Sequence, residues 1–200
     1  MLHQRLNGNS LYNSPKQMLA KLIVVLAFAV PAIGQQPCSL TAATAPAVSG
    51  FRLGMSYADI QQVLGPSIKV KPAKTGEGTV FESFAEAPAP QRLSGIQAFW
   101  LRFANNRVYQ IEIFYTDSAR PQRIEDLTAR LSNEFKLPSS EWKIKNNLAR
   151  FECGDVLLTA DTILNPHVEL TDTTAKSEFD KKQADAKKPD KKKESKKTTK

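Results

Sequence analysis

Apolar and polar positions alternate most clearly between residues 95 and 115, GIQAFWLRFANNRVYQIEIFY. Two runs rich in β-branched and aromatic residues flank Asn105 and Asn106 there, a pattern typical of paired strands. Asparagine tolerates the left-handed backbone conformation that a tight turn requires. The stretch therefore predicts a long β-hairpin.

The length of the hairpin loop decides which side chains share a face, because a slip of one residue moves a whole set to the other face. A two-residue loop opposes Phe99 to Glu112, whereas a three-residue loop over 104–106 opposes Phe99 to Ile111. We prefer the three-residue loop because it gathers one apolar face, made of Phe99, Leu101, Phe103, Tyr109, Ile111 and Ile113. The other face then holds Ile96, Trp100, Arg102, Gln110, Glu112 and Phe114.

The six residues of this second face form our candidate partner-binding site. Aromatic anchors beside an arginine have the composition of an interface hot spot, whereas a plain solvent-facing sheet surface carries mainly Thr, Lys, Glu and Ser. An alternative stays open, in which the second helix or the later strands cover this face and make it core.

A short helix is predicted upstream of the hairpin by its end signals. Ser56 is a good N-cap, and Asp59 stands at the position that completes a capping box and favours the helix dipole. Gly65 supplies a C-terminal residue that tolerates positive φ, and Pro66 forbids continuation. The helix therefore spans roughly two to three turns.

A second helix is predicted after residues 120–121, because Ile124, Leu127, Leu131 and Phe135 recur at helical spacing until Leu137 and Pro138. Short strands are expected at residues 67–70, 78–85, 141–145, 148–153, 156–160 and 167–170, with tight turns at 146–147 and 154–155. These elements predict an α+β domain over 51–172, with two helices on one face of an antiparallel sheet of hairpins. The segments 51–116 and 121–172 are compatible with two loosely repeated halves.

The first helix resembles a motif of small exported α+β domains. The matching residues are Leu53, Gly54, Met55, Ser56, Asp59, Val63, Leu64 and Gly65. Such a motif occurs in the SmpA/OmlA (BamE-like) outer-membrane assembly domains and in β-lactamase-inhibitor-like proteins. Those families are non-enzymatic binding modules, so the resemblance implies a protein–protein role. Unlike in the lipoprotein branch, no lipobox precedes Cys38.

The N-terminal segment has the features of a secretory signal peptide. A lysine, an apolar run from Leu22 to Val30 and small residues up to Gly34 predict cleavage after Gly34, and translation could start at Met18. The alternative is a membrane anchor, but a span needs about 20 apolar residues, more than this run offers. We therefore expect an exported, periplasmic or secreted chain without a transmembrane span after cleavage.

The two cysteines, Cys38 and Cys153, are expected to form a disulfide, because an oxidising compartment favours the bond and no third cysteine competes. Two free thiols are the alternative. Residues 35–50, rich in Ala, Thr and Pro beyond Cys38, are interpreted as an irregular N-terminal arm that anchors little besides this bridge.

The net charge of +8 lies at the ends of the chain. Residues 35–174 hold fourteen Lys and Arg against fifteen Asp and Glu, so we do not expect nucleic acid as a partner. Residues 175–200 hold eleven Lys against five acids and few apolar residues, which predicts a disordered Lys-rich tail over 173–200. The tail is either a solvated tether or a polycation that adheres to an anionic cell-envelope surface.

No catalytic motif or metal-ligand spacing stands out in the sequence. His167 is the one histidine after the signal segment, and a zinc site needs three or four ligands. We therefore expect a non-catalytic binding module of the cell envelope with a protein partner and no cofactor. The alternatives are a small hydrolase-like enzyme that uses carboxylates or His167, and a surface-adhering protein that acts through its tail.

Overall fold

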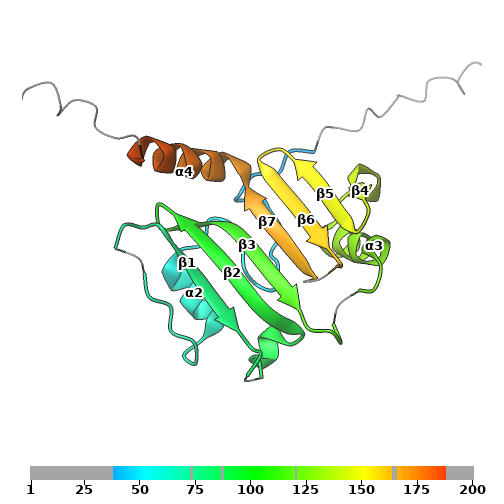
Figure 1. The fold of residues 1–200 in the computed structure, drawn as a ribbon, viewed down its shortest axis with the longest axis horizontal. Coiled ribbons are helices and arrows are strands. Elements are labelled where there is room, and N and C mark those ends of the chain that lie inside the picture. The colour runs from blue at the N-terminus through cyan, green and yellow to red at the C-terminus, as the bar shows by residue number, and fades with distance from the viewer. Residues whose placement is uncertain (1–37, 73, 87, 120, 164–165, 188–200) are drawn as a thin grey trace, which may run out of the picture. The chain divides into compact units, whose positions relative to one another are not determined.

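The computed structural model describes residues 38–72, 74–86, 88–119, 121–163 and 166–187. Its centre is a seven-stranded antiparallel sheet in the order β1-β2-β3-β7-β6-β5-β4 (Figure 1). The strands are β1 (Gly78–Ser83), β2 (Ile96–Ala104), β3 (Arg107–Tyr115), β4 (Lys143–Lys145), β5 (Leu148–Cys153), β6 (Val156–Asp161) and β7 (His167–Asp172). The helices are α2 (Tyr57–Leu64), α3 (Ile124–Phe135) and α4 (Thr173–Ala186), with 3₁₀ turns η2 (Gln91–Leu93) and η3 (Ser139–Glu141). The predicted α+β class is confirmed.

The order of elements divides the sheet into two meanders. The first runs α2-β1-β2-β3 and the second α3-β4-β5-β6-β7, so each begins with a helix, as the two predicted halves do. The last strands of the two meanders, β3 and β7, pair antiparallel and join them into one sheet.

One face of the sheet, here called the core face, carries the hydrophobic core. Residues opposite one another in neighbouring antiparallel strands share a face. The row that crosses the core face consists of Val80, Leu101, Ile111, Leu170, Leu158 and Phe151. From α2, Tyr57 stacks on Phe103 with ring centroids 3.8 Å apart, and from α3, Leu127 is fully buried in the same core. Both predicted helices therefore lie on the core face.

The loop of the central hairpin has two residues, so the three-residue loop was the wrong choice. Asn105 and Asn106 have φ of 50° and 60°, the left-handed conformations of a tight hairpin turn. Beyond the turn, the register shifts by one residue at Tyr109, and Leu101 then faces Ile111. This β-bulge restores apolar pairing, and it removes Tyr109 from the core face on which we expected it.

A second irregularity lies at the other end of the hairpin. The register shifts between Ile96 and Ala98, so Ile96 points into the core and is 3% exposed. Its assignment to the candidate partner-binding site was wrong, because strict alternation along β2 fails at this bulge.

The ends of α2 agree with the sequence signals, but the segment after it does not. Ser56 and Asp59 form the predicted capping box, in which the Asp59 backbone N–H donates to Ser56 Oγ at 3.2 Å. The strand expected at 67–70 is absent from the described structure. Instead the Gln61 side chain donates to the Ile68 carbonyl and accepts from the Val70 N–H, so a side chain replaces the partner strand.

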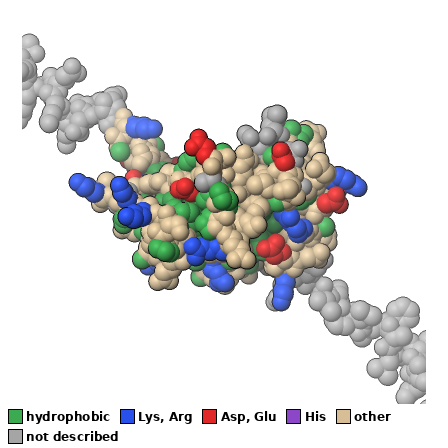
Figure 2. Space-filling view, turned by 90° about the horizontal axis from the view of Figure 1, so that it is seen from below, with side chains coloured by type: hydrophobic (Ala, Val, Ile, Leu, Met, Phe, Trp, Pro, Cys, Tyr) green, Lys and Arg blue, Asp and Glu red, His purple; other side chains and the backbone are tan. Residues whose placement is uncertain are grey.

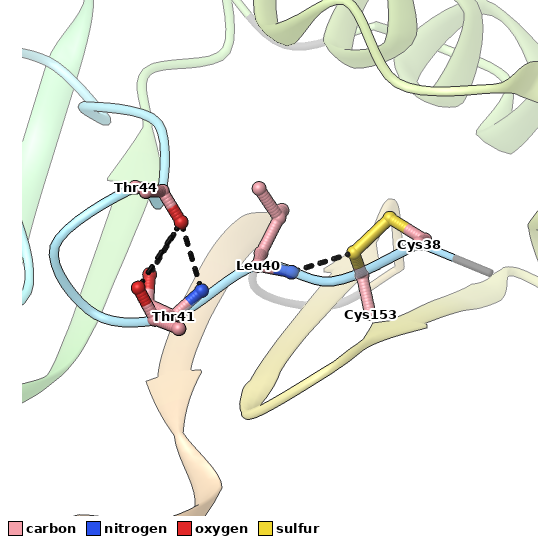
Figure 3. The surroundings of a disulfide bond; sticks show 5 residues. All are labelled: Cys38, Leu40, Thr41, Thr44 and Cys153. Carbon is pink, nitrogen blue, oxygen red and sulfur yellow. Dashed lines mark hydrogen bonds between the residues drawn. A yellow bond between two sulfur atoms is a disulfide. The ribbon is translucent and has the colours of Figure 1, made fainter. Parts of the chain in front are cut away.

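The described part of the N-terminal arm packs against the domain, and the fold begins earlier than residue 51. Cys38 and Cys153 lie at disulfide distance, with Cα atoms 5.0 Å apart (Figure 3). The Leu40 N–H donates to Cys153 Sγ at 3.2 Å, and the Leu40 carbonyl accepts from the Asp155 N–H at 2.9 Å. Val48 is buried in the core. The arm is therefore held by packing and hydrogen bonds as well as by the bridge.

The start of the predicted disordered tail is a helix. Asp172 caps α4 by accepting from the Ala175 N–H at 2.9 Å, and Phe179 packs against Tyr109. The packing of Phe179 against the sheet stabilises a helix that the composition of the segment does not predict. The signal peptide and the rest of the tail, 188–200, lie outside the described residues.

Candidate functional site

The side of the sheet away from the core, here called the open face, carries a strip of aromatic side chains across four strands. Phe81 packs edge-on against Trp100 at 5.5 Å between ring centroids, and Trp100 packs edge-on against Phe114 at 6.0 Å. Phe114 in turn contacts His167 of β7 at 5.4 Å. We call these four residues the aromatic strip. Its geometry is that of favourable aromatic pairs, so the rings hold one another in place.

The aromatic strip reaches the surface. Trp100 is 36% exposed and Phe81 is 52% exposed, although large aromatic side chains are usually well buried. The alternative in which α3 or the later strands cover this face is therefore wrong, since α3 packs on the core face. At one end of the open face lies α4 (Figure 1), where Tyr109 is buried against Phe179.

Two hollows flank Trp100 on the open face. The larger, of about 530 Å³, lies between the sheet and α4 and is lined by Gly78, Thr79, Phe81, Trp100, Arg102, Tyr109 and Phe179. The smaller, of about 260 Å³, is lined by Phe81, Ser83, Gln97, Ala98, Trp100 and Phe114. Phe81 and Trp100 border both, so they are the centre of this surface.

Arg102 brings a positive charge into the larger hollow. Its guanidinium lies over the Trp100 ring, 5.8 Å from the centroid, in a cation–π contact. No described carboxylate lies within ion-pair distance of it. Burial raises the pKa of the neighbouring Tyr109 hydroxyl, and the charge of Arg102 opposes that shift.

Two acidic residues of the open face, Glu112 and Glu169, follow Trp100 in the same cross-strand row, since Glu112 is opposite Trp100 in the β2–β3 pair. Glu112 is opposite Glu169 in the β3–β7 pair, and Glu112 Oε1 is 3.9 Å from His167 Nε2. Burial raises the pKa of the Glu112 carboxyl, and the charges of His167 and Arg102 act in the opposite direction. Neither Glu112 nor His167 lines either of the two hollows beside Trp100.

Five of the six predicted site residues lie together on the open face. Trp100, Arg102, Gln110, Glu112 and Phe114 share it, whereas Ile96 belongs to the core. Gln110 is buried, and its Oε1 has no hydrogen-bond partner among the described residues. Sequence reasoning missed Phe81, Tyr109 and Phe179. Only Phe81 had a usable signal, since it lies at an alternate position of a predicted strand.

Charge does not form one broad patch on the side of the domain seen in Figure 2. Figure 2 shows lysines, arginines and acidic residues mixed on the side seen there, with hydrophobic side chains reaching the surface between them. Within the part of the chain that the structure describes, no group of three or more His, Cys, Asp or Glu side chains is arranged to hold a metal ion. None of the described helices has the length and apolar content needed to cross a bilayer.

Comparisons with protein-family models, with curated proteins and with solved structures find no match to this chain. The resemblance carried by the α2 motif therefore stays a prediction, and the feature that points to a function is the open face itself.

Proposed function

We propose that this chain is an exported, non-catalytic binding module of the cell envelope that holds a protein partner on the open face of its sheet. The observation that carries the proposal is the exposure of Trp100 and Phe81 on a face that the two core helices leave uncovered. Exposed aromatic residues next to an arginine resemble the anchors of protein interfaces. Export is supported by the apolar N-terminal segment and by the Cys38–Cys153 pair at disulfide distance.

The experiment is partner recovery from envelope extracts with matched alanine variants as bait. We expect Trp100→Ala and Phe81→Ala to lose the partner, because they remove the anchors of the surface. Ile144→Ala is the control, because Ile144 is also a large apolar residue and is 43% exposed. It lies on β4, the edge strand at the opposite end of the sheet from β1. Equal recovery by the wild-type bait and all three variants would contradict the proposal.

A folding control accompanies this experiment. Trp100→Ala should lower the free energy of unfolding by about 1–2 kcal/mol, since the ring is only partly buried. Phe99→Ala, which truncates a fully buried neighbour, should cost about 3–5 kcal/mol. Loss of the partner by a folded Trp100→Ala variant then reports on binding alone.

A further inference from the structure

The side chains that line the larger hollow of the open face indicate the chemistry of its ligand. From the geometry we infer that it takes a partner segment in which an aromatic side chain is flanked by acidic residues. This inference rests on the proposed function and names the kind of partner.

The aromatic side chains that line the hollow indicate that its ligand contains an aromatic ring. Phe81, Trp100 and Tyr109 present ring faces and edges around a space of about 530 Å³, which lies within the usual range of ligand sites. Edge-to-face and offset contacts of the kind already made between Phe81 and Trp100 favour another ring over an aliphatic chain.

The acidic part follows from charge complementarity. Arg102 is the one charged residue among the described residues that line the hollow, and no described carboxylate lies within ion-pair distance of it. Glu112 attracts the guanidinium from beyond that distance. Its position over Trp100 fixes the guanidinium beside the aromatic walls. A carboxylate next to the inserted ring would form a charge-assisted hydrogen bond there. Glu112, opposite Trp100, and Glu169, next in the same row, disfavour an acidic segment on the β3 and β7 side of Trp100.

The chain itself contains an example of such a segment. In α4, Phe179 stacks on Tyr109 at one wall of the hollow, and its neighbours in sequence are Glu178 and Asp180. Asp180 is close enough to Tyr109 to contribute to the raised pKa of its hydroxyl. Asp180 forms its ion pair with Lys176 of the same helix, at 2.6 Å, and not with Arg102. The remaining space next to Phe179 suits a second ring, with its acidic neighbour placed on Arg102. Residues 188–200 contain no aromatic residue and are rich in lysine, so they do not fit this description.

The test is a selection of random peptides of about twelve residues, displayed on phage, against the immobilised full chain. We expect enrichment, by about tenfold over the input, of peptides with Phe, Tyr or Trp next to Asp or Glu. Arg102→Gln should keep the aromatic preference and lose the acidic one, whereas Arg102→Lys should retain both. Trp100→Ala should enrich neither, and Ile144→Ala should behave as wild type. Circular dichroism checks that each variant is folded.

Three outcomes would overturn the inference. Enrichment of aromatic peptides without acidic neighbours would reject the acidic partner and leave the proposed function standing. Absence of any Trp100-dependent enrichment would reject both. A concentration-dependent dimer in light scattering that Trp100→Ala abolishes would assign the open face to a second copy of this chain.

Discussion

Tyr109 of β3 and Phe179 of α4 stack with ring centroids 5.4 Å apart and an interplanar angle of 30°. Two polar contacts accompany the stack, one from Lys182 to Asn105 and one from Gln183 to Glu77. No residue of α4 is fully buried. The first turn of α4 is fixed to the β5–β6 turn, because the Thr173 N–H and hydroxyl donate to the Asp155 carbonyl at 2.8 and 3.0 Å. Beyond that turn, the helix is held to the sheet by a few contacts around one ring.

Phe179→Ala should detach the part of α4 beyond its first turn from the sheet. The stack contributes about 0.5–1.5 kcal/mol beyond the area it buries, and an isolated helix of this length is marginal in water. Hydrogen exchange should then show loss of protection in α4 amides, with the core strands unchanged. Glu178→Ala, on the same helix, serves as the control. Unchanged protection of α4 in Phe179→Ala would contradict this account of its docking.

Cys153→Ser should lower the free energy of unfolding by about 2–4 kcal/mol under non-reducing conditions, because the bridge closes a long loop. Thermal unfolding should show a midpoint several degrees below that of wild type. Cys38→Ser breaks the same bridge, so its thermal midpoint should equal that of Cys153→Ser. Equal midpoints for wild type and both variants would mean that the bridge does not form in solution.

Gly154→Ala should destabilise the protein more than Gly54→Ala. Both glycines have positive φ, so an added Cβ costs about 1–2 kcal/mol at either position. At Gly154 the Cβ would also overlap the Leu40 carbonyl oxygen and lie 3.0 Å from its nitrogen, whereas nothing lies within 4 Å at Gly54. Chemical denaturation should show an extra cost of about 1–3 kcal/mol for Gly154→Ala. Equal destabilisation by the two substitutions would contradict the packing of the N-terminal arm at Leu40 against Gly154.

The capping box of α2 should make stability depend on acid pH. The Ser56 backbone N–H donates to Asp59 and lowers the pKa of its carboxyl below the ordinary value of 3.8. Ionised Asp59 therefore stabilises the fold above that value, and this contribution is lost as the pH falls through the folded-state pKa. The Tm of Asp59→Asn should lie below that of wild type at neutral pH, with a gap that closes in acid. A gap independent of pH would rule out the carboxylate as its source.

Local signals in the sequence predict the parts of the fold that depend on local chemistry. Ser56, Asp59 and Gly65 delimit α2, and the pairs at 105–106 and 154–155 form the tight turns of two hairpins. The alternation of side chains along β2 also predicts the face of the sheet on which Trp100 lies. These elements obey rules that act within a few residues of the chain.

The remaining features depend on contacts between distant segments. The bulge at Tyr109 exists because it lets Leu101 meet Ile111 across the hairpin, and no turn signal encodes it. Composition likewise misses α4, since one ring, Phe179, anchors a segment that is otherwise polar. The hollow beside Trp100 depends on both, because Tyr109 and Phe179 form part of its wall.

Photo-crosslinking in cells that produce the protein tests the open face most directly. A photoreactive phenylalanine analogue would replace Phe81, Trp100 or Ile144, one position at a time, in the full chain. If the open face holds a partner, positions 81 and 100 yield the same crosslinked product and position 144, on edge strand β4, does not. Absence of a product from positions 81 and 100, or an equal yield from position 144, would contradict the binding function proposed for this face.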